Sequence, residues 1–546
     1  MRSRPNPRRE RPRRSRLAAV LVTILAVTAA LVVAGCAKGS GSSAPADGGN
    51  GVASGKPVPG GSLTVLEGPL TGTWPAGLDP GTNTTGTYDQ SYMDAIYGEL
   101  FELGPNGTTI PDLATGYKVL DNGLTVQISL RPGVTFSDGT PFNAAAVKYN
   151  IERDLGFTCT CTPTWPLKSV TTPGALTVDI NLTKPFAALI NSFHAADVNW
   201  IASPTAIQKM GEAAFRIKPV GAGPFTVVSD SLSDQLVLKR NPGYWDKPEP
   251  YLDGLTFRVV ASDNAALEDM QAGQGDAYEG LQAVSLVPQF EQHFTVTNEH
   301  STSVYVVQLN TKTAPFSSIK AREAIYYATN AQQLDAKLYD GLQVMTQSFM
   351  APGGLFAEAA VPGYRTYDLA KAKALVKQLG GLSITTEGAT PGSTLENLIE
   401  GIASQWEQAG IKVTIIPSTS LTSAMQAFRS GTWQSFVQTV GAFDPAAGLG
   451  VGVRFLSTSF ESGIDNPTLD GLFAKAAGEL SPAARGQVYD QAAEYISANA
   501  LAPLLFAVVD FNVAAKDVRG TGLTSYLPGS AVRPEVLWET VYRTNG

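Results

Sequence analysis

The stretch that decides the fold runs from Leu382 to Gly441 and reads LSITTEGATPGSTLENLIEGIASQWEQAGIKVTIIPSTSLTSAMQAFRSGTWQSFVQTVG. Short runs rich in β-branched residues alternate in it with longer segments of helical periodicity. We predict strands over 382–387, 411–416 and 434–440, and helices over 393–409 and 419–430. Strands that alternate with helices in this way indicate right-handed crossovers and a mainly parallel sheet. The predicted fold class is therefore α/β.

Each of the two predicted helices has one apolar face. The stripe of the first consists of Leu395, Leu398, Ile402 and Trp406, and that of the second of Leu421, Met425 and Phe428. Ser393 and Glu396 have the spacing of a capping box, which predicts the start of the first helix.

Ligands of open α/β sheets bind beyond the carboxyl ends of the strands. The last predicted strand of the stretch ends in VGAFDP, residues 440–445, so Gly441, Phe443 and Asp444 are candidate ligand-binding residues. Asp444 is better explained as the cap of a local turn. Phe443 and Trp433 are equally consistent with stacking on a ligand and with packing in the core.

A second informative segment, residues 117–155, predicts a hairpin followed by a helix. Asn122-Gly123 is a strong hairpin signal because both residues tolerate positive φ. From Leu124 to Leu130 apolar and polar residues alternate, which indicates a half-buried strand. Asn143 has the position of a helix cap.

Near the start of the folded part, a helix is predicted from apolar residues at helical spacing. Its buried face consists of Met93, Ile96, Tyr97, Leu100 and Phe101. Tyr88 and Asp89 precede this face, and they are candidates for ligand contact, with helix initiation as the alternative.

The N-terminus has the pattern of a secretory signal. Residues 1–16 contain eight Arg and one Glu, and Leu17 to Ala34 is uncharged and almost wholly apolar. Val33-Ala34-Gly35-Cys36 resembles a bacterial lipobox, which implies cleavage before Cys36 and a lipid on its thiol. A retained membrane anchor is the alternative. Arg13-Arg14 leaves the export route open between the general secretory and the twin-arginine pathway.

Length and charge restrict the class of protein. Removal of residues 1–35 leaves 511 residues and takes away a net charge of +7, so the formal charge changes from −8 to −15. A chain of this size is expected to form two or more lobes. Its acidity argues against a nucleic-acid partner, because phosphate would be repelled.

The remaining cysteines and the histidines do not predict a redox or metal site. Cys159 and Cys161 are separated by one residue, and both a local disulfide and two free thiols are consistent with that spacing. The chain has three His. His194 has no second candidate ligand near it in sequence, so we interpret it as a surface or core histidine.

Several segments together resemble the extracytoplasmic solute-binding proteins of ATP-driven importers, in the large class of dipeptide, oligopeptide and nickel binders. They include YGELFEL, PDLATGY, DNGLTVQISLRPGVTFSDGTPFNAAAVKYN, GAGPF, LKRNPGYWDKPEPYLDGLTFRVV, LNTKTAPFSSIKAREAIYYATN, YDLAKAKALVKQLG and QWEQAGIKVTI, in the order of that class. The resemblance covers most of residues 62–515.

The resemblance implies a two-lobed periplasmic-binding-protein fold whose lobes are joined by crossing strands. The implied divisions are a signal (1–35), a flexible tether (36–61), lobe one (62–101, 216–309 and 506–546), its inserted subdomain (102–215) and lobe two (310–505).

The resemblance also implies a function. A lipid-anchored, monomeric protein on the outer face of the cell membrane would capture a peptide or peptide-like solute and deliver it to a permease driven by ATPase subunits, without a cofactor. Tyr278 and Glu279 follow a loop that faces the cleft in this class, which makes them candidates for ligand contact, with exposure to solvent as the alternative. Peptide binders of the class place an Asp for the ligand's amino group where Gly441 stands here. We therefore expect a ligand that lacks a free amino group, or whose amino group is bound by Asp89 or Glu279.

Two other functions remain as alternatives. A secreted, lipid-anchored hydrolase would need catalytic residues, and the chain has neither G-x-S-x-G nor H-E-x-x-H. A carboxylate pair would still suffice for glycoside hydrolysis. A binding protein used in sensing without transport would have the same features as a transport protein.

Overall fold

The computed structural model describes residues 56–68, 74, 76–82, 90–103, 109–157, 165–194, 196–352, 354–358, 360–389, 393–417, 421–441, 444–447, 450–520, 523 and 536–544. All of them belong to the compact unit Asn50–Gly546. The predictions for Cys36, Tyr88, Asp89, Cys159, Cys161 and Phe443 lie outside the described residues.

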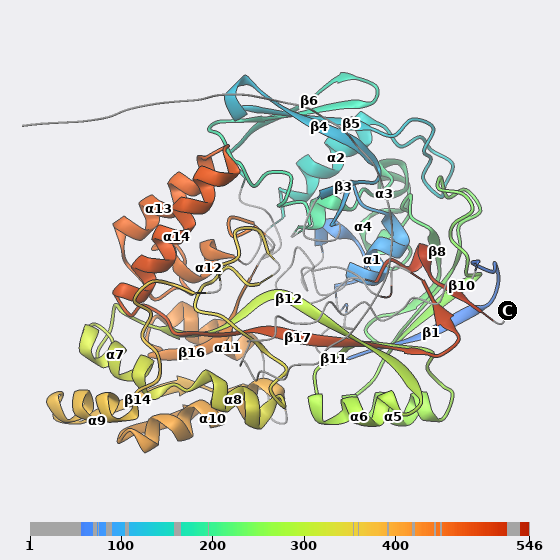
Figure 1. The fold of residues 1–546 in the computed structure, drawn as a ribbon. Coiled ribbons are helices and arrows are strands. Elements are labelled where there is room, and N and C mark those ends of the chain that lie inside the picture. Colours follow the sequence, from blue (N-terminus) through green and yellow to red (C-terminus); the bar gives the residue numbers. More distant parts are fainter. Residues whose placement is uncertain are drawn as a thin grey trace, which may run out of the picture. The chain divides into compact units, whose positions relative to one another are not determined.

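One 11-stranded sheet forms the centre of this unit (Figure 1). Ten of its strands follow one another in the order β15 (Ile411–Ile416), β14 (Leu382–Glu387), β16 (Ser435–Gly441), β12 (Phe294–Leu309), β17 (Leu504–Ala515), β11 (Ala277–Leu281), β1 (Ser62–Glu67), β10 (Gly254–Val259), β9 (Gln235–Arg240) and β8 (Phe225–Ser231). The short β13 (Val344–Met345) pairs with β17.

Strands β12 and β17 connect the two ends of the sheet. They pair antiparallel with each other, while β12 also pairs with β16 and β17 also pairs with β11. We call the part built on β1 and β8–β11 lobe one, and the part built on β14–β16 lobe two. The chain enters lobe two after Leu309 and leaves it at Leu504.

The predicted parallel pairing is confirmed for the strands between Leu382 and Gly441, but it does not extend to the sheet as a whole. Strand β14 is parallel to β15 and β16, and β1 is parallel to β10 and β11. These two parallel groups are joined through antiparallel pairs. Local periodicity reports which segments are strands, whereas the pairing of distant strands sets their directions.

The segment that decided the fold class has the predicted elements. Helices α10 (Thr394–Gln408) and α11 (Leu421–Ser430) alternate with β14, β15 and β16. The Ser393 hydroxyl accepts a hydrogen bond of 3.2 Å from the Glu396 backbone N–H, which confirms the predicted cap. Leu398, Ile402 and Trp406 are fully buried, so the apolar face of α10 is also confirmed.

The apolar core differs between the two faces of the sheet. On one face a single cluster extends through both lobes, from α5 and α6 under lobe one to α7–α10 under lobe two. These helices are α5 (Asp263–Gln271), α6 (Val287–Glu291), α7 (Ile319–Ala328), α8 (Ala331–Leu338) and α9 (Leu369–Gln378) together with α10.

On the other face the core is divided. One cluster packs lobe one against α1, α3 and α4, and another packs lobe two against α12, α13 and α14. The helices of this face are α1 (Gln90–Tyr97), α3 (Pro204–Met210), α4 (Glu212–Phe215), α12 (Val451–Phe455), α13 (Pro467–Gly478) and α14 (Pro482–Ala498). In Figure 1 these two groups of helices stand apart above β12 and β17. We call the face between them the divided face.

A four-stranded antiparallel sheet extends lobe one. Its strands are β4 (Ala114–Leu120), β5 (Thr125–Leu130), β7 (Thr177–Leu182) and β6 (Leu167–Gly174), in that order, and α2 (Ala144–Asp154) accompanies them. Asn122 and Gly123 both have positive φ in the turn between β4 and β5, as predicted. The Asn143 side chain accepts a hydrogen bond of 3.0 Å from the Ala146 N–H and so caps α2.

Two boundaries differ from the prediction. Helix α1 ends at Tyr97, because Gly98 adopts φ +65° and turns the chain. Leu100 and Phe101 are buried, as expected, but Leu100 follows the helix and Phe101 opens β2 (Phe101–Leu103). Leu124 lies in the hairpin turn and is 40% exposed.

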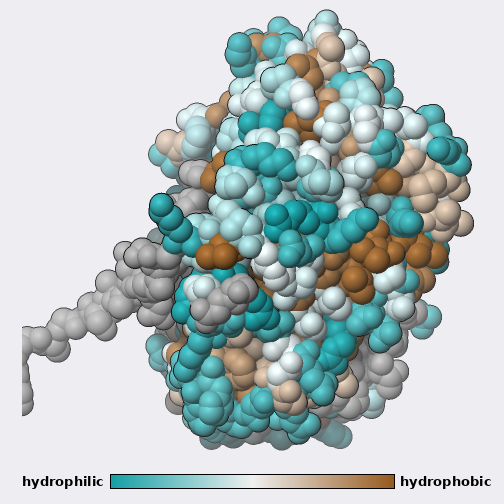
Figure 2. Space-filling model, turned by 90° about the vertical axis from the view of Figure 1, so that its right-hand side faces the viewer, coloured by the Kyte–Doolittle hydropathy of each residue, from teal (hydrophilic) through white to brown (hydrophobic). Residues whose placement is uncertain are grey.

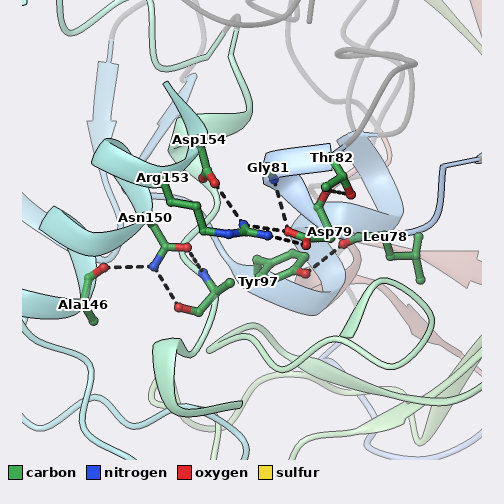
Figure 3. A network of polar contacts seen from close by, with 10 residues as sticks. Leu78, Asp79, Gly81, Thr82, Tyr97, Ala146, Asn150, Arg153 and Asp154 are labelled. Carbon is green, nitrogen blue, oxygen red and sulfur yellow. Dashed lines mark hydrogen bonds and ion pairs between the residues drawn. The ribbon is translucent and has the colours of Figure 1, made fainter. Parts of the chain in front are cut away.

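Arg153, at the end of α2, connects the four-stranded sheet to the rest of lobe one (Figure 3). Its guanidinium donates to both carboxylate oxygens of Asp79, at 2.9 and 2.5 Å, and to Asp154 at 3.1 Å. All three side chains are largely buried. Burial, only partly offset by Arg153, raises the pKa of Asp154. A buried ion pair of this kind fixes geometry more than it adds stability.

No helix in the described part of the chain is long and apolar enough to cross a membrane. Figure 2 shows one face of the molecule, on which hydrophilic and intermediate side chains predominate and one apolar band is visible.

Carboxyl groups gather around the start of the four-stranded sheet. Glu99, Asp112 and Glu539 are all more than nine-tenths buried. Burial, together with neighbouring carboxylates, raises their pKa values well above the ordinary range. The same two causes raise the pKa of Glu102 to about 7, against the opposing charge of Arg131.

We predict that this cluster makes the protein less stable as the pH rises. A carboxyl group with a raised pKa in the folded state stabilises the fold below about pH 4.5, and that contribution is lost as the pH passes about 7. Glu102→Gln removes one titrating group. Between about pH 5 and about pH 8, the free energy of unfolding of both proteins, measured in urea, should decrease. The decrease should be smaller in Glu102→Gln than in the wild type, by about 1 kcal/mol.

Glu400→Gln, at an exposed position on α10, is the matched control and should leave the pH dependence unchanged. Equal pH dependence of the wild type and Glu102→Gln would contradict the prediction.

Candidate functional site

Polar residues fill the divided face where its two apolar clusters end. Val65, Ala277 and Ala514 belong to the cluster of lobe one. Glu67 and Glu279 follow Val65 and Ala277 by two residues, and on the antiparallel β17 Asn512 and Asp510 precede Ala514 by two and four residues. All four are buried, with exposed fractions of 2%, 4%, 6% and 0%. Buried polar groups are uncommon in a core, so this face is the candidate ligand site.

Strand register places two carboxylates side by side. Strands β1 and β11 are parallel, and Glu67 is the direct partner of Glu279. Glu67 ends β1, and the carboxyl ends of strands are the position at which open α/β sheets bind ligands, while Glu279 lies beside it in the middle of β11. The Ser91 hydroxyl, on α1, donates a hydrogen bond of 2.6 Å to Glu279 Oε2. This bond confirms that Glu279 faces α1 on the divided face.

A second group of polar residues follows β16 at the edge of lobe two. Gly441 ends β16 opposite Ser303 of β12. Asp444 is fully buried, and Arg485 of α14 donates to both of its carboxylate oxygens at 2.6 Å. The Ala446 N–H donates to the same side chain at 3.0 Å, so Asp444 also closes the turn proposed from the sequence.

The Asp444–Arg485 pair is shielded from water. Burial lowers the pKa of Arg485, but the charge of Asp444 more than compensates, so the pKa is raised overall. Arg485 also donates to the Ala476 carbonyl at 3.1 Å and to the Tyr489 hydroxyl at 3.0 Å. Asp444 is thus engaged by a guanidinium of its own lobe.

Two hydrogen bonds cross from the four-stranded-sheet side of lobe one to lobe two. Asn191 Nδ2 donates to Asp444 at 2.9 Å, and the Ala187 N–H donates to the Ala477 carbonyl at 2.8 Å. Close to them, Gly123 faces Leu480: a β-carbon at Gly123 would lie 2.9 Å from a Leu480 methyl group. The described structure therefore has the two lobes in contact.

Tyr278 and Trp433 lie inside apolar clusters. Tyr278 points to the opposite face of the sheet from Glu279, stacks on Phe290 and donates its hydroxyl to Asp263. Trp433 is 2% exposed and packs edge-on against Phe428. Their predicted contact with a ligand stays a prediction.

His194 belongs to no metal site among the described residues. Burial lowers the pKa of His194 to about 3, so its imidazole is neutral. The Thr109 hydroxyl lies 3.4 Å from its Nε2. The described residues contain no group of three or more His, Cys, Asp or Glu that could hold a metal ion.

A separate pocket of about 310 Å³ lies within lobe two. Its walls come from the end of α7, the start of α8, residues 364–367 and the start of β17. It contains none of the residues predicted to bind a ligand.

Sequence reasoning missed most of the polar face. It identified Glu279, Gly441 and Asp444, but not Glu67, Ser91 or Asn512. Glu67 could have been found, because it stands at the carboxyl end of a strand, where open α/β sheets bind ligands. The position of Asn512 between the two clusters depends on the pairing of β17 with β11, for which the sequence has no local signal.

Comparison with known proteins assigns the chain to a family. Residues 108–451 match the family model described as bacterial extracellular solute-binding proteins, family 5 Middle. The glutathione-binding protein GsiB of Salmonella typhi is 32% identical over 357 residues, which are 62% of this chain and 66% of that protein. GsiB of Escherichia coli O157:H7 is 28% identical over 463 residues, which are 82% of this chain and 89% of that protein.

Solved structures show the same two-lobed fold. The substrate-binding protein CtaP of Listeria monocytogenes has a TM-score of 0.76 at 20% identity, over 89% of this chain and all of that one. The oligopeptide-binding protein AppA of Bacillus subtilis, in complex with a nonapeptide, has a TM-score of 0.73 at 19% identity, over 90% of this chain and all of that one. The members of this family bind solutes and are not enzymes.

We predict that Arg485 neutralises Asp444 as a structural pair. Arg485→Met leaves a buried carboxylate without its cation and should lower the free energy of unfolding by about 3–5 kcal/mol. Adding Asp444→Asn removes the stranded charge and should restore at least about half of that loss. The free energies of unfolding of the single and the double variant are measured by urea unfolding.

The matched control is Arg258→Met, because the Arg258–Asp269 ion pair is 28% exposed on each side. It should cost at most about 1 kcal/mol. Additive losses in the Arg485→Met, Asp444→Asn double variant would mean that the two side chains do not act as a pair.

Proposed function

Because the chain belongs to family 5 of the bacterial extracellular solute-binding proteins, we propose that it is the substrate-binding component of an ATP-driven importer. It captures a peptide or peptide-like solute between its two lobes and delivers it to a membrane permease. The observation that carries this proposal is the buried polar face between two apolar clusters, at the strands that connect the lobes.

The mechanism rests on contacts made with both lobes at once. Lobe one contributes Glu67 and Glu279, the connecting strand β17 contributes Asn512, and lobe two meets lobe one at Asp444 and Asn191. A solute that touches both lobes stabilises the closed arrangement through its differential contacts. Closure removes water, so each polar contact with the solute becomes stronger. The closed arrangement is the form that the permease recognises.

Relatives and neighbours support a peptide-like solute. Two curated relatives are glutathione-binding proteins, and glutathione is a tripeptide with a free amino group. Among the proteins of similar fold, one was solved with the peptide STSA and another with Met-Leu. The protein acts as a monomer and needs no cofactor.

The N-terminal features complete the proposal. Residues 1–35 are removed as a signal, Cys36 carries the lipid, and 36–61 is the tether that holds the folded part outside the membrane. Tyr88, Asp89 and Phe443 contribute to the solute site. Cys159 and Cys161 are structural, as a disulfide or as thiols. The remaining divisions are lobe one (62–101, 216–309 and 506–546), its inserted subdomain (102–215) and lobe two (310–505).

Solute binding should make the protein more compact. Glutathione and a panel of peptides of two to five residues are titrated by calorimetry, and X-ray scattering is recorded with and without each binder. We expect at least one member to bind and to reduce the radius of gyration. Titrations with citrate and with a sugar are the controls for non-peptide solutes. If no panel member binds, the peptide assignment is wrong, whatever the scattering shows.

Lipid attachment at Cys36 is tested in cells. Cys36→Ser should either leave the signal uncleaved or release the protein from the membrane fraction, because two acyl chains are needed for stable anchoring. Fractionation and mass spectrometry of the N-terminus report both outcomes. Ser40→Ala, in the tether, is the control. A Cys36→Ser protein that is processed and still sediments with membranes would refute the lipid anchor.

A further inference from the structure

The two neighbouring carboxylates of the divided face form an unusual arrangement. Glu67 and Glu279 are direct partners on parallel strands, so their side chains project from the same face. They are 2% and 4% exposed. Like charges so close together and so far from water are costly unless a cation or a proton lies between or beside them.

Asn512 presents a fixed hydrogen-bond donor next to this pair. Tyr278 pairs with Val513 and Leu281 pairs with Phe511, so Glu279 and Gly280 together oppose Asn512 in a bulge. Gly280 has φ +73°, a conformation that favours glycine at such a site. Its N–H donates to Asn512 Oδ1 at 3.3 Å. This bond identifies which end of the amide is oxygen and therefore holds Nδ2 in place.

Asn512 Nδ2 is the second observation that points to a ligand. The side chain is 6% exposed, and Nδ2 has no hydrogen-bond partner among the residues that the structure describes. A buried N–H without an acceptor is expensive, so natural proteins rarely keep one. A ligand carbonyl oxygen would satisfy it.

We propose that Glu67, Glu279 and Asn512 form the subsite for the amino end of a peptide ligand. The ammonium group binds the two carboxylates, and the first carbonyl oxygen of the ligand accepts a hydrogen bond from Asn512 Nδ2. An amino-terminal residue has these two groups next to each other. This inference rests on the proposed function and specifies which lobe binds the amine.

Charge at the alternative position supports the same assignment. Gly441 has no carboxylate, and Asp444 is engaged by Arg485 through two hydrogen bonds of 2.6 Å. A second cation at Asp444 would meet the guanidinium. On the divided face, by contrast, two acids stand together, and Ser91 orients one of them.

The subsite does not require that the two carboxylates lack other interactions. Glu67 and Glu279 already take part in interactions within the chain. Each carboxylate offers about four lone-pair positions, and an ammonium needs three acceptors. The ammonium therefore adds to the existing contacts.

The test compares free and blocked amino groups. The α-linked di- to pentapeptides of the panel are titrated by calorimetry in parallel with their N-acetylated forms. We expect acetylation to weaken binding by at least about tenfold, because it removes the charge and two donors. Glu67→Gln and Glu279→Gln should each weaken the free-amino form by about tenfold and affect the acetylated form by less than about threefold.

Glu268→Gln, exposed on α5 at the opposite face of the sheet, changes the net charge equally and should have no effect. Thermal unfolding without ligand confirms that each variant folds. A merely structural role of the two acids would weaken both ligand forms alike, and that result overturns the proposal. Equal affinity for free and acetylated peptides overturns it while the peptide-binding function stands. Failure of every panel member overturns both.

Discussion

The antiparallel pairing of β12 with β17 is the constraint on which the rest of the molecule depends. These two strands belong to both lobes, and their ladder makes one sheet out of two groups of parallel strands. A sheet satisfies its backbone hydrogen bonds only when every strand has neighbours, so the lobes cannot separate at this point without exposing them. On one face the core follows the sheet without interruption, from α5 to α10. On the divided face, by contrast, no single apolar cluster of the described residues joins the two lobes.

The divided face explains why polar residues are tolerated at the centre of the protein. Apolar packing ends at Val65, Ala277 and Ala514 on one side and begins again at Ala507 on the other. Between these limits, the buried side chains are polar, and they are stabilised by hydrogen bonds in place of apolar packing. The groups placed there, two adjacent carboxylates and an amide held by Gly280, are suited to binding a polar solute away from water.

Much of the fold was predictable, because its elements have local signals. The five elements between Leu382 and Gly441, the cap at Asn143 and the turn at Asn122-Gly123 were all found from the sequence. Leu100 and Phe101 were placed on α1 because helical spacing continues through them, although Gly98 ends the helix. The sheet was predicted to be mainly parallel because crossovers are local, whereas the antiparallel pairing of β12 with β17 joins residues about two hundred positions apart.

The candidate site was harder to predict, because it depends on register. Glu279 was found from its loop, but its neighbour Glu67 became visible only when β1 and β11 were paired. The turn at Asp444 was predictable from the sequence. Its partner Arg485 was not, because it follows Asp444 by 41 residues. Trp433 had equal reasons to be a stacking surface or a core residue, and burial against Phe428 and Phe436 is a tertiary property.

The contact of Asn191 with Asp444 has a consequence for how readily the empty protein opens. Arg485 holds Asp444 from within lobe two, so separation of the lobes leaves no charge stranded. Among the described residues, the hydrogen bonds lost are one amide-to-carboxylate bond and the backbone bond between Ala187 and Ala477, together on the order of 2 kcal/mol. Such a latch is weak enough for thermal motion to release it. Under the proposed function, the captured solute therefore supplies most of the free energy that keeps the two lobes together.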